Sequence, residues 1–231
     1  MGKCVFIGVS GKARAGKDTF SDFLLDIIIS KYNKTVIKVA YADELKRKIM
    51  NEFDLSWEQL YGDLKEVPDK RYPKKSLINK LNNKEDGKVW QDKDLYWTPR
   101  EIMQFIGTDC YREVDNEFWV KSLFKSVNPE EYDFIIVSDC RFESEIDPIV
   151  LAGGYHVNIN RENSDSITNN SHKSETSLGD GYKVDFYIQN NGNLQDLNKT
   201  AEDIMRIIEE SSFFNKKEAH SYGFTLGSGG D

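Results

Sequence analysis

The first residues able to carry out chemistry lie near the start of the chain, where residues 11–19 read GKARAGKDT. Two glycines with four residues between them, followed by Lys17, form the pattern G-x(4)-G-K. It follows an apolar run at 5–9 and precedes a stretch with helical spacing, the strand–loop–helix setting of a phosphate-binding loop. There, backbone N–H groups surround an anion, the helix N-terminus adds positive potential, and the lysine ammonium lies between the β- and γ-phosphates.

One position departs from the usual pattern. Asp18 stands where a Ser or Thr hydroxyl normally binds Mg²⁺. A carboxylate there can hold the magnesium shell through water, and Thr19 can reach the α-phosphate. The competing interpretation is a glycine turn that binds nothing. Because motif and setting both match, we favour a nucleotide site, and the absence of GxGxxG argues against a dinucleotide fold.

The elements around this loop predict a parallel sheet covered by helices, because strands and helices alternate along the chain. We expect strands at 5–9, 35–40, 132–137, 155–159 and 184–189. We expect helices at 18–32, at 43–53 with Asp43 near its start as a cap, from Thr98 with Glu101 in a capping box, and at 118–126, 143–152 and 194–212.

The domain organisation that we predict is a single α/β domain over residues 1–215. Residues 54–97 mix both charge signs with aromatics and read as an inserted arm, and the polar residues 163–181 read as a lid-like loop. Residues 216–231 end in GSGGD and are expected to be a flexible tail.

Composition excludes several classes of protein. The chain has 231 residues and a net charge of −8, so a nucleic-acid-coating surface is not expected. No apolar run is long enough to span a membrane. The cysteines are Cys4, Cys110 and Cys140, and the histidines are His156, His172 and His220. Their wide spacing argues against disulfides and zinc, and favours a reducing, cytoplasmic setting.

A phosphate loop alone does not separate kinases, GTPases and motor ATPases. Further motifs are GKDT at 16–19, YADELK at 41–46, TPRE at 98–101, QFIGT at 104–108, DCRFESE at 139–145, Gly153-Gly154, INR at 159–161 and HKSE at 172–175. In this order the chain resembles the deoxynucleoside monophosphate kinases of tailed bacteriophages, up to about residue 210 and apart from 54–97.

The resemblance implies a three-layer P-loop kinase fold and transfer of the γ-phosphoryl group of ATP to a dNMP, giving ADP and dNDP with Mg²⁺. The expected partners are ATP and dNMP, without nucleic acid or membrane, in the cytoplasm of the host if the protein is phage-encoded. A homodimer is left open, as are the bases accepted and discrimination against ribose.

The motif and the resemblance together assign the site residues. The ATP side is Arg14, Ala15, Gly16, Lys17, Asp18, Thr19 and Arg161, with magnesium held by Asp18 through water. The dNMP side is Arg100, Gly107, Thr108, Trp119, Asp139, Arg141 and Glu145. Lys17, Asp139 and Arg141 are the expected catalytic residues. Arginine suits the role because its planar fork binds phosphate oxygens in pairs.

Structural roles compete with several of these assignments. Arg100 can be a solvated residue of a first helical turn, Trp119 a core residue, Asp139 a helix cap, and Glu145 an ion-pair partner. At the level of function, the alternatives are another small-molecule kinase, such as a dephospho-coenzyme A or phosphomevalonate kinase, and a non-catalytic nucleotide-binding module. ADP release that depends on the acceptor separates them.

Overall fold

The computed structural model describes residues 4–74, 91–162, 178, 181–213 and 222–226. Its contacts divide the chain into two compact units, one of residues 1–41 and 120–231 and the other of residues 42–119. The second unit extends on both sides of the predicted arm, 54–97. Residues 75–90 of that arm and most of the loop at 163–181 lie outside the described residues.

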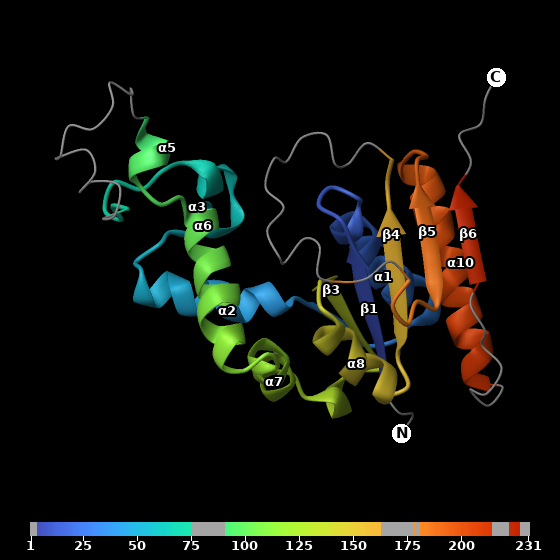
Figure 1. Ribbon diagram of the computed structural model, residues 1–231. Coiled ribbons are helices and arrows are strands. Elements are labelled where there is room, and N and C mark those ends of the chain that lie inside the picture. Colours follow the sequence, from blue (N-terminus) through green and yellow to red (C-terminus); the bar gives the residue numbers. More distant parts are fainter. Residues whose placement is uncertain (1–3, 75–90, 163–177, 179–180, 214–221, 227–231) are drawn as a thin grey trace, which may run out of the picture. The chain divides into compact units, whose positions relative to one another are not determined.

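The first unit is built on a six-stranded sheet in which every neighbouring pair is parallel (Figure 1). The strand order is β2-β3-β1-β4-β5-β6. The strands are β1 (Val5–Gly11), β2 (Val36–Val39), β3 (Phe134–Cys140), β4 (Tyr155–Asn160), β5 (Phe186–Asn190) and β6 (Tyr222–Leu226). The carboxyl end of β1 therefore opens between those of β3 and β4, and open α/β sheets bind ligands at this edge.

Alternation along β1 assigns each face of the sheet to a different set of helices. Ile7 and Val9 belong to one buried cluster with apolar side chains of α1 (Lys17–Tyr32) and α10 (Leu194–Phe213). Phe6 points to the opposite face, where its ring lies 5.4 Å from that of Phe124 of α7 (Phe118–Ser126). The buried Ile146 and Ile149 belong to α8 (Glu143–Leu151), which also packs on β1 and β4. Helices cover both faces of the parallel sheet, which confirms the predicted α/β class.

The second unit is made of short helical segments. They are α2 (Tyr41–Glu52, which begins one residue before the unit), α3 (Trp57–Tyr61), the 3₁₀ turn η1 (Asp63–Glu66), α5 (Asp92–Leu95), α6 (Pro99–Gln104) and the π-helix η2 (Phe105–Arg112). A 3₁₀ turn, η3 (Pro129–Glu131), belongs to the first unit. The core of the second unit consists of the buried Ile49, Leu55, Leu60 and Ile102.

Two features differ from the sequence-based expectations. Residues 222–226, within the expected flexible tail, pair with β5 as the edge strand β6, and their sequence YGFTL has the aromatic and β-branched residues that favour strands. The helix expected to start near Asp43 begins at Tyr41, and the carboxylate that accepts its first N–H is that of Asp139. Among the described helices, none has the length and apolarity needed to cross a membrane.

Candidate active site

The phosphate loop adopts a backbone that only its glycines allow at two points. Gly11 has φ +136°, and a Cβ there would lie 2.0 Å from the carbonyl oxygen of Ile159 on β4. Gly16, at the N-terminus of α1, has φ +102°. Arg14 also has a positive φ of 63° and an exposed side chain. The predicted loop between strand and helix is therefore present, and its two motif glycines are required by the backbone.

A residue that the sequence did not indicate holds the middle of this loop in place through a hydrogen bond. Asn190, the last residue of β5, is buried, and its side-chain Nδ2 donates to the carbonyl oxygen of Ala15 at 2.8 Å. A Cβ at Gly16 would lie 2.6 Å from the same nitrogen. The amide therefore fixes the middle of the loop and excludes a side chain at Gly16. No local pattern could reveal this contact, because the two residues are 175 positions apart.

The cationic group of the loop is held by the loop itself. Lys17, half-buried in the first turn of α1, donates from Nζ to the carbonyl oxygens of Gly11 at 2.7 Å and Lys12 at 2.8 Å. In the same turn Asp18 is exposed and Thr19 is half-buried. The structure thus places the ammonium over the loop and leaves the Asp18 carboxylate open to solvent.

The carboxyl end of β3 carries a connected set of hydrogen bonds. Asp139 is half-buried, and its Oδ1 accepts from the backbone N–H of Tyr41 at 2.7 Å. Glu145 is buried, and its Oε2 accepts from the backbone N–H groups of Arg141 at 2.6 Å and Phe142 at 3.1 Å. The Oη of Tyr41 donates to the carbonyl oxygen of Glu145 at 2.9 Å. The segment that carries Asp139 and Arg141 is therefore anchored at both ends.

A second polar network that the sequence did not reveal supports β1 just before the loop. Ser10 and His156 are fully buried, with Ser10 Oγ 2.7 Å from His156 Nε2. Asn158 donates to Ser10 Oγ at 2.9 Å, and His156 Nδ1 lies 2.9 Å from the carbonyl oxygen of Tyr182. Nδ1 must donate to that carbonyl, so Nε2 accepts the Ser10 hydroxyl proton. Burial lowers the pKa of His156, which favours this neutral form.

The remaining predicted residue of the first unit is Arg161. It is exposed and directly follows β4. The next residue, Glu162, donates its backbone N–H to the side chain of Asn191 at 3.0 Å, which ties the ends of β4 and β5 together. The residues that follow, 163–177, lie outside the described part of the chain, and His172 is among them.

In the second unit, Arg100 lies in the first turn of α6. The predicted capping box is confirmed: Thr98 Oγ1 accepts from the N–H of Glu101 at 3.2 Å, and Glu101 Oε2 accepts from the N–H of Thr98 at 2.8 Å. Arg100 forms an ion pair with Glu66 of η1, and the two side chains are 43% and 64% exposed. An ion pair with this much exposure contributes little free energy to the fold.

Gly107, Thr108 and Trp119 meet around the π-helix η2. A Cβ at Gly107 would lie 2.7 Å from a methyl group of Leu45 on α2, so this glycine allows the two helices to approach closely. The indole N–H of Trp119 donates to the Gly107 carbonyl oxygen at 2.8 Å, and the ring is 3% exposed. Thr108 is half-buried. π-Helices are rare and occur often at functional sites, and this one contains two of the predicted residues.

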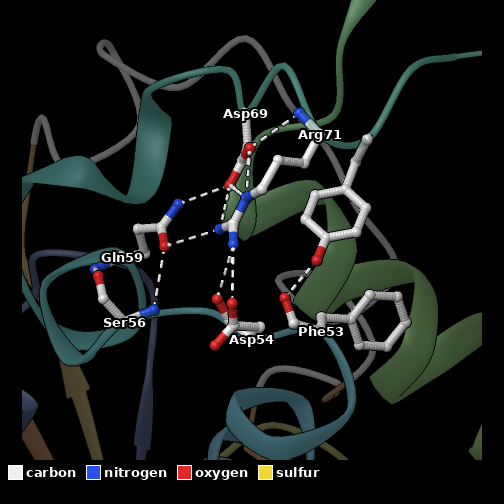
Figure 2. Close-up of polar contacts among 7 residues, drawn as sticks. Phe53, Asp54, Ser56, Gln59, Asp69 and Arg71 are labelled. Atoms are coloured by element: carbon white, nitrogen blue, oxygen red, sulfur yellow. Dashed lines mark hydrogen bonds and ion pairs between the residues drawn. The ribbon is translucent and has the colours of Figure 1, made fainter.

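The second unit also contains a polar cluster centred on Arg71 (Figure 2). Its guanidinium donates to Asp69 through Nε at 3.0 Å and Nη2 at 2.7 Å, and to Asp54 Oδ2 at 3.3 Å. Gln59 donates to Asp69 Oδ2 at 2.8 Å. These bonds connect the turn after α2 to residues 69–71. The guanidinium holds the pKa of Asp69 at about 2, below its ordinary value of 3.8.

With this geometry described, comparisons with known proteins identify the family. A family model described as deoxynucleotide monophosphate kinase matches residues 63–201, more than half of the chain. A protein of Acanthamoeba polyphaga mimivirus, named "Putative deoxynucleotide monophosphate kinase", is 29% identical over 209 residues, which cover 83% of this chain and 91% of the relative. The chain belongs to the deoxynucleotide monophosphate kinase family.

A second curated relative of the kinase is the deoxynucleotide monophosphate kinase of Enterobacteria phage T4. It is 28% identical over 138 residues, which cover 57% of this chain and 52% of the relative. The family model begins at residue 63, so the phosphate loop lies outside the matched range and is supported by its own geometry. The resemblance seen in the motifs is confirmed, and the activity is that of a deoxynucleotide monophosphate kinase.

The oxygen donors of the kinase fit magnesium better than a transition metal. Among the described residues, no group of three or more His, Cys, Asp or Glu side chains could hold a metal ion. Mg²⁺ is usually bound by one or two carboxylates and completed by water and substrate phosphates. The exposed carboxylate of Asp18 beside the phosphate loop and that of Asp139 on the adjacent strand suit this mode of binding.

Proposed function

We propose that the kinase transfers the γ-phosphoryl group of ATP to a deoxynucleoside 5′-monophosphate, giving ADP and a deoxynucleoside diphosphate. The observation that carries this proposal is a phosphate loop whose own carbonyl oxygens bind the Lys17 ammonium, in a member of this family. The N–H groups of Ala15 and Gly16 would bind the phosphates of ATP. Arg14, Thr19 and Arg161 would add further contacts.

The reaction needs little covalent help from the protein. The acceptor is a phosphate oxygen, and a phosphate monoester has a second pKa of about 6, so it is already ionised at neutral pH. An oxygen–phosphorus bond forms to the γ-phosphorus, the bond to the β–γ bridging oxygen breaks, and ADP leaves with the electron pair. No general base is required, and catalysis consists of alignment and charge neutralisation. Lys17 and Arg141 would neutralise the charge on the transferring group.

Asp18, through water, and Asp139 are the residues that would hold magnesium. Bound there, the ion would neutralise charge on the β- and γ-phosphates. The exposed position of Asp18 in the first turn of α1 supports a contact through water, because the side chain can orient toward a hydrated ion.

On the acceptor side, Arg100 would bind the monophosphate in exchange for Glu66. Gly107, Thr108 and Trp119 would form a wall for the nucleoside, and the near-complete burial of Trp119 supports a wall more than an exposed stacking platform. The bonds of Glu145 to the N–H groups of residues 141 and 142 support a role in orienting Arg141 toward the substrate.

The test is ADP production from ATP with each of the four dNMPs and their ribose counterparts, with and without Mg²⁺. Dephospho-coenzyme A and phosphomevalonate serve as the comparison acceptors. Release of ADP that depends on a dNMP supports the proposal. ADP release that is independent of every acceptor, or that is fastest with one of the comparison acceptors, contradicts it.

The cysteines Cys4, Cys110 and Cys140 are free, which supports assays under reducing conditions and a cytoplasmic location.

A further inference from the structure

Tyr41 is a buried residue at the point where the chain leaves the first unit. It ends the stretch 1–41, begins α2, and is 3% exposed. Its backbone N–H donates to Asp139 Oδ1 at 2.7 Å, and its hydroxyl donates to the carbonyl oxygen of Glu145 at 2.9 Å. One residue therefore links two elements at the nucleotide-binding edge of the sheet, β3 and α8.

The bond to Asp139 does two things at once. The first N–H groups of a helix have no partner inside the helix, and a carboxylate that accepts one of them stabilises the helix start. The same charge-assisted bond holds the carboxylate in one orientation. Asp139 thus serves as the N-terminal cap of α2 although it lies 98 positions further along the chain.

The bond from the hydroxyl extends this restraint to Arg141. The Tyr41 hydroxyl fixes the first turn of α8 through the Glu145 carbonyl, and the Glu145 carboxylate fixes the backbone of Arg141. A buried hydroxyl without an acceptor is costly, so this bond also specifies where the ring and its backbone lie.

We propose that Tyr41 is a positioning residue of the phosphoryl-transfer reaction, which orients the carboxylate of Asp139 and the start of α8 and acts on the substrates only through them. The inference rests on the proposed function, in which Asp139 holds magnesium. Reactions that depend on alignment are sensitive to small displacements, and an error of about 1 Å can cost on the order of 100-fold in rate.

The test compares Tyr41→Phe with Tyr155→Phe. Each change removes one phenolic hydroxyl and keeps the ring. Tyr155 lies on β4 in the cluster with α1 and α10, and its Oη is 2.7 Å from Ser211 Oγ. It therefore controls for the general cost of losing a tyrosine hydrogen bond away from the carboxyl end of β3.

We expect Tyr41→Phe to lower kcat about tenfold and to raise the Mg²⁺ concentration for half-maximal activity, with the KM for dNMP within about twofold of wild type. Calorimetric titration with ADP, which needs no turnover, should show weaker binding of ADP with Mg²⁺ and unchanged binding of metal-free ADP. Tyr155→Phe should leave all these quantities within about twofold of wild type.

Equal effects of the two variants on the Mg²⁺-dependent affinity for ADP would overturn the inference, whatever their melting temperatures. Failure of the proposed function would be seen in a different measurement. A wild-type protein that binds ADP but transfers no phosphoryl group to any dNMP would contradict the proposed reaction. In that case the calorimetric comparison still decides whether Tyr41 orients the metal-binding carboxylate.

Discussion

The Nζ of Lys17 lies 2.7 Å from the carbonyl oxygen of Gly11, the residue with which the phosphate loop begins. A second carbonyl, that of Lys12, accepts from the same group at 2.8 Å. The ammonium is thus oriented by two carbonyl oxygens of the loop itself. Charge that is already in place needs no reorganisation when negative charge develops during transfer, which is where electrostatic catalysis gains most.

We predict that Lys17→Ala lowers kcat on the order of 100- to 1000-fold, the usual effect of removing one such stabilising group. The fold should survive, because the ammonium donates to loop carbonyls and the side chain lies outside the main apolar cluster. The control is Lys31→Ala on the same helix, where Lys31 forms an exposed ion pair with Glu202. Steady-state kinetics and circular dichroism check both. Wild-type turnover in folded Lys17→Ala would remove the basis for the phosphate-loop assignment.

We predict that Gly11→Ala destabilises the protein severely and abolishes nucleotide binding. The added methyl group would meet the Ile159 carbonyl oxygen at 2.0 Å, in a backbone conformation that already disfavours any side chain. Gly181→Ala is the matched control, because Gly181 has φ +81° but no atom of the described residues lies within 4 Å of a Cβ added there. It should cost only the backbone strain, about 1 kcal/mol. Denaturant unfolding of both variants measures the difference, and equal losses would contradict the steric argument.

We predict that Arg100→Lys mainly raises the KM for dNMP and leaves the KM for ATP unchanged, because lysine keeps the charge but loses the planar fork. Glu66→Gln should lower the KM for dNMP, since it removes the counter-ion that the phosphate displaces. Both are checked by varying each substrate in turn. A weaker affinity for ATP with unchanged dNMP affinity would reverse the assignment of Arg100.

We predict that Arg141→Lys lowers kcat as well as the apparent affinity for dNMP. The backbone of Arg141 is fixed by Glu145 at the carboxyl end of β3, next to the strand that leads into the phosphate loop. A group at that edge is expected to contact the transferring phosphate, and its fork would then be needed in the transition state. The measurement is kcat at saturating ATP and dNMP. An unchanged kcat would limit Arg141 to binding.

We predict an acid-sensitive contribution to stability from Asp69. Its pKa is about 2 in the folded protein, chiefly because of the hydrogen bonds from Arg71, against an ordinary value of 3.8 in an unfolded chain, so folding favours the ionised form. This contribution is complete above about pH 4 and is lost as the pH falls toward 2. Asp69→Asn should destabilise the protein at pH 7 and flatten the dependence of unfolding on pH between 4 and 2. A parallel pH dependence in both proteins would show that the pair contributes nothing.

The sequence predicts the features that depend on local pattern. The spacing of glycines and lysine in residues 11–19, and the capping box of Thr98 and Glu101, each specify a short stretch of backbone, and the structure contains both. The remaining features depend on contacts between distant residues. The sequence around Ala15 does not predict its hydrogen bond with Asn190. The sequence around Tyr41 does not predict that a carboxylate of β3 caps the helix that begins there.

The sequence also does not predict that η2 is a π-helix. Its residues 105–112 keep an apolar spacing compatible with an ordinary helix, and the wider turn is visible only in the backbone. For Glu145 the sequence suggests substrate contact or an ion pair with lysine, and it does not predict that the buried carboxylate accepts hydrogen bonds from two backbone N–H groups. Buried carboxylates need such donors, but which donors they find is decided by the tertiary structure.

The bond between Asn190 and Ala15 has a consequence for how the protein is made. Synthesis proceeds from the N-terminus at about 5–20 residues per second, so the 175 positions between these residues correspond to roughly 10–35 s. Throughout that interval the nascent chain carries the complete glycine–lysine motif without the amide that holds it closed. We therefore expect ATP affinity to arise late during translation, when β5 takes its place in the sheet.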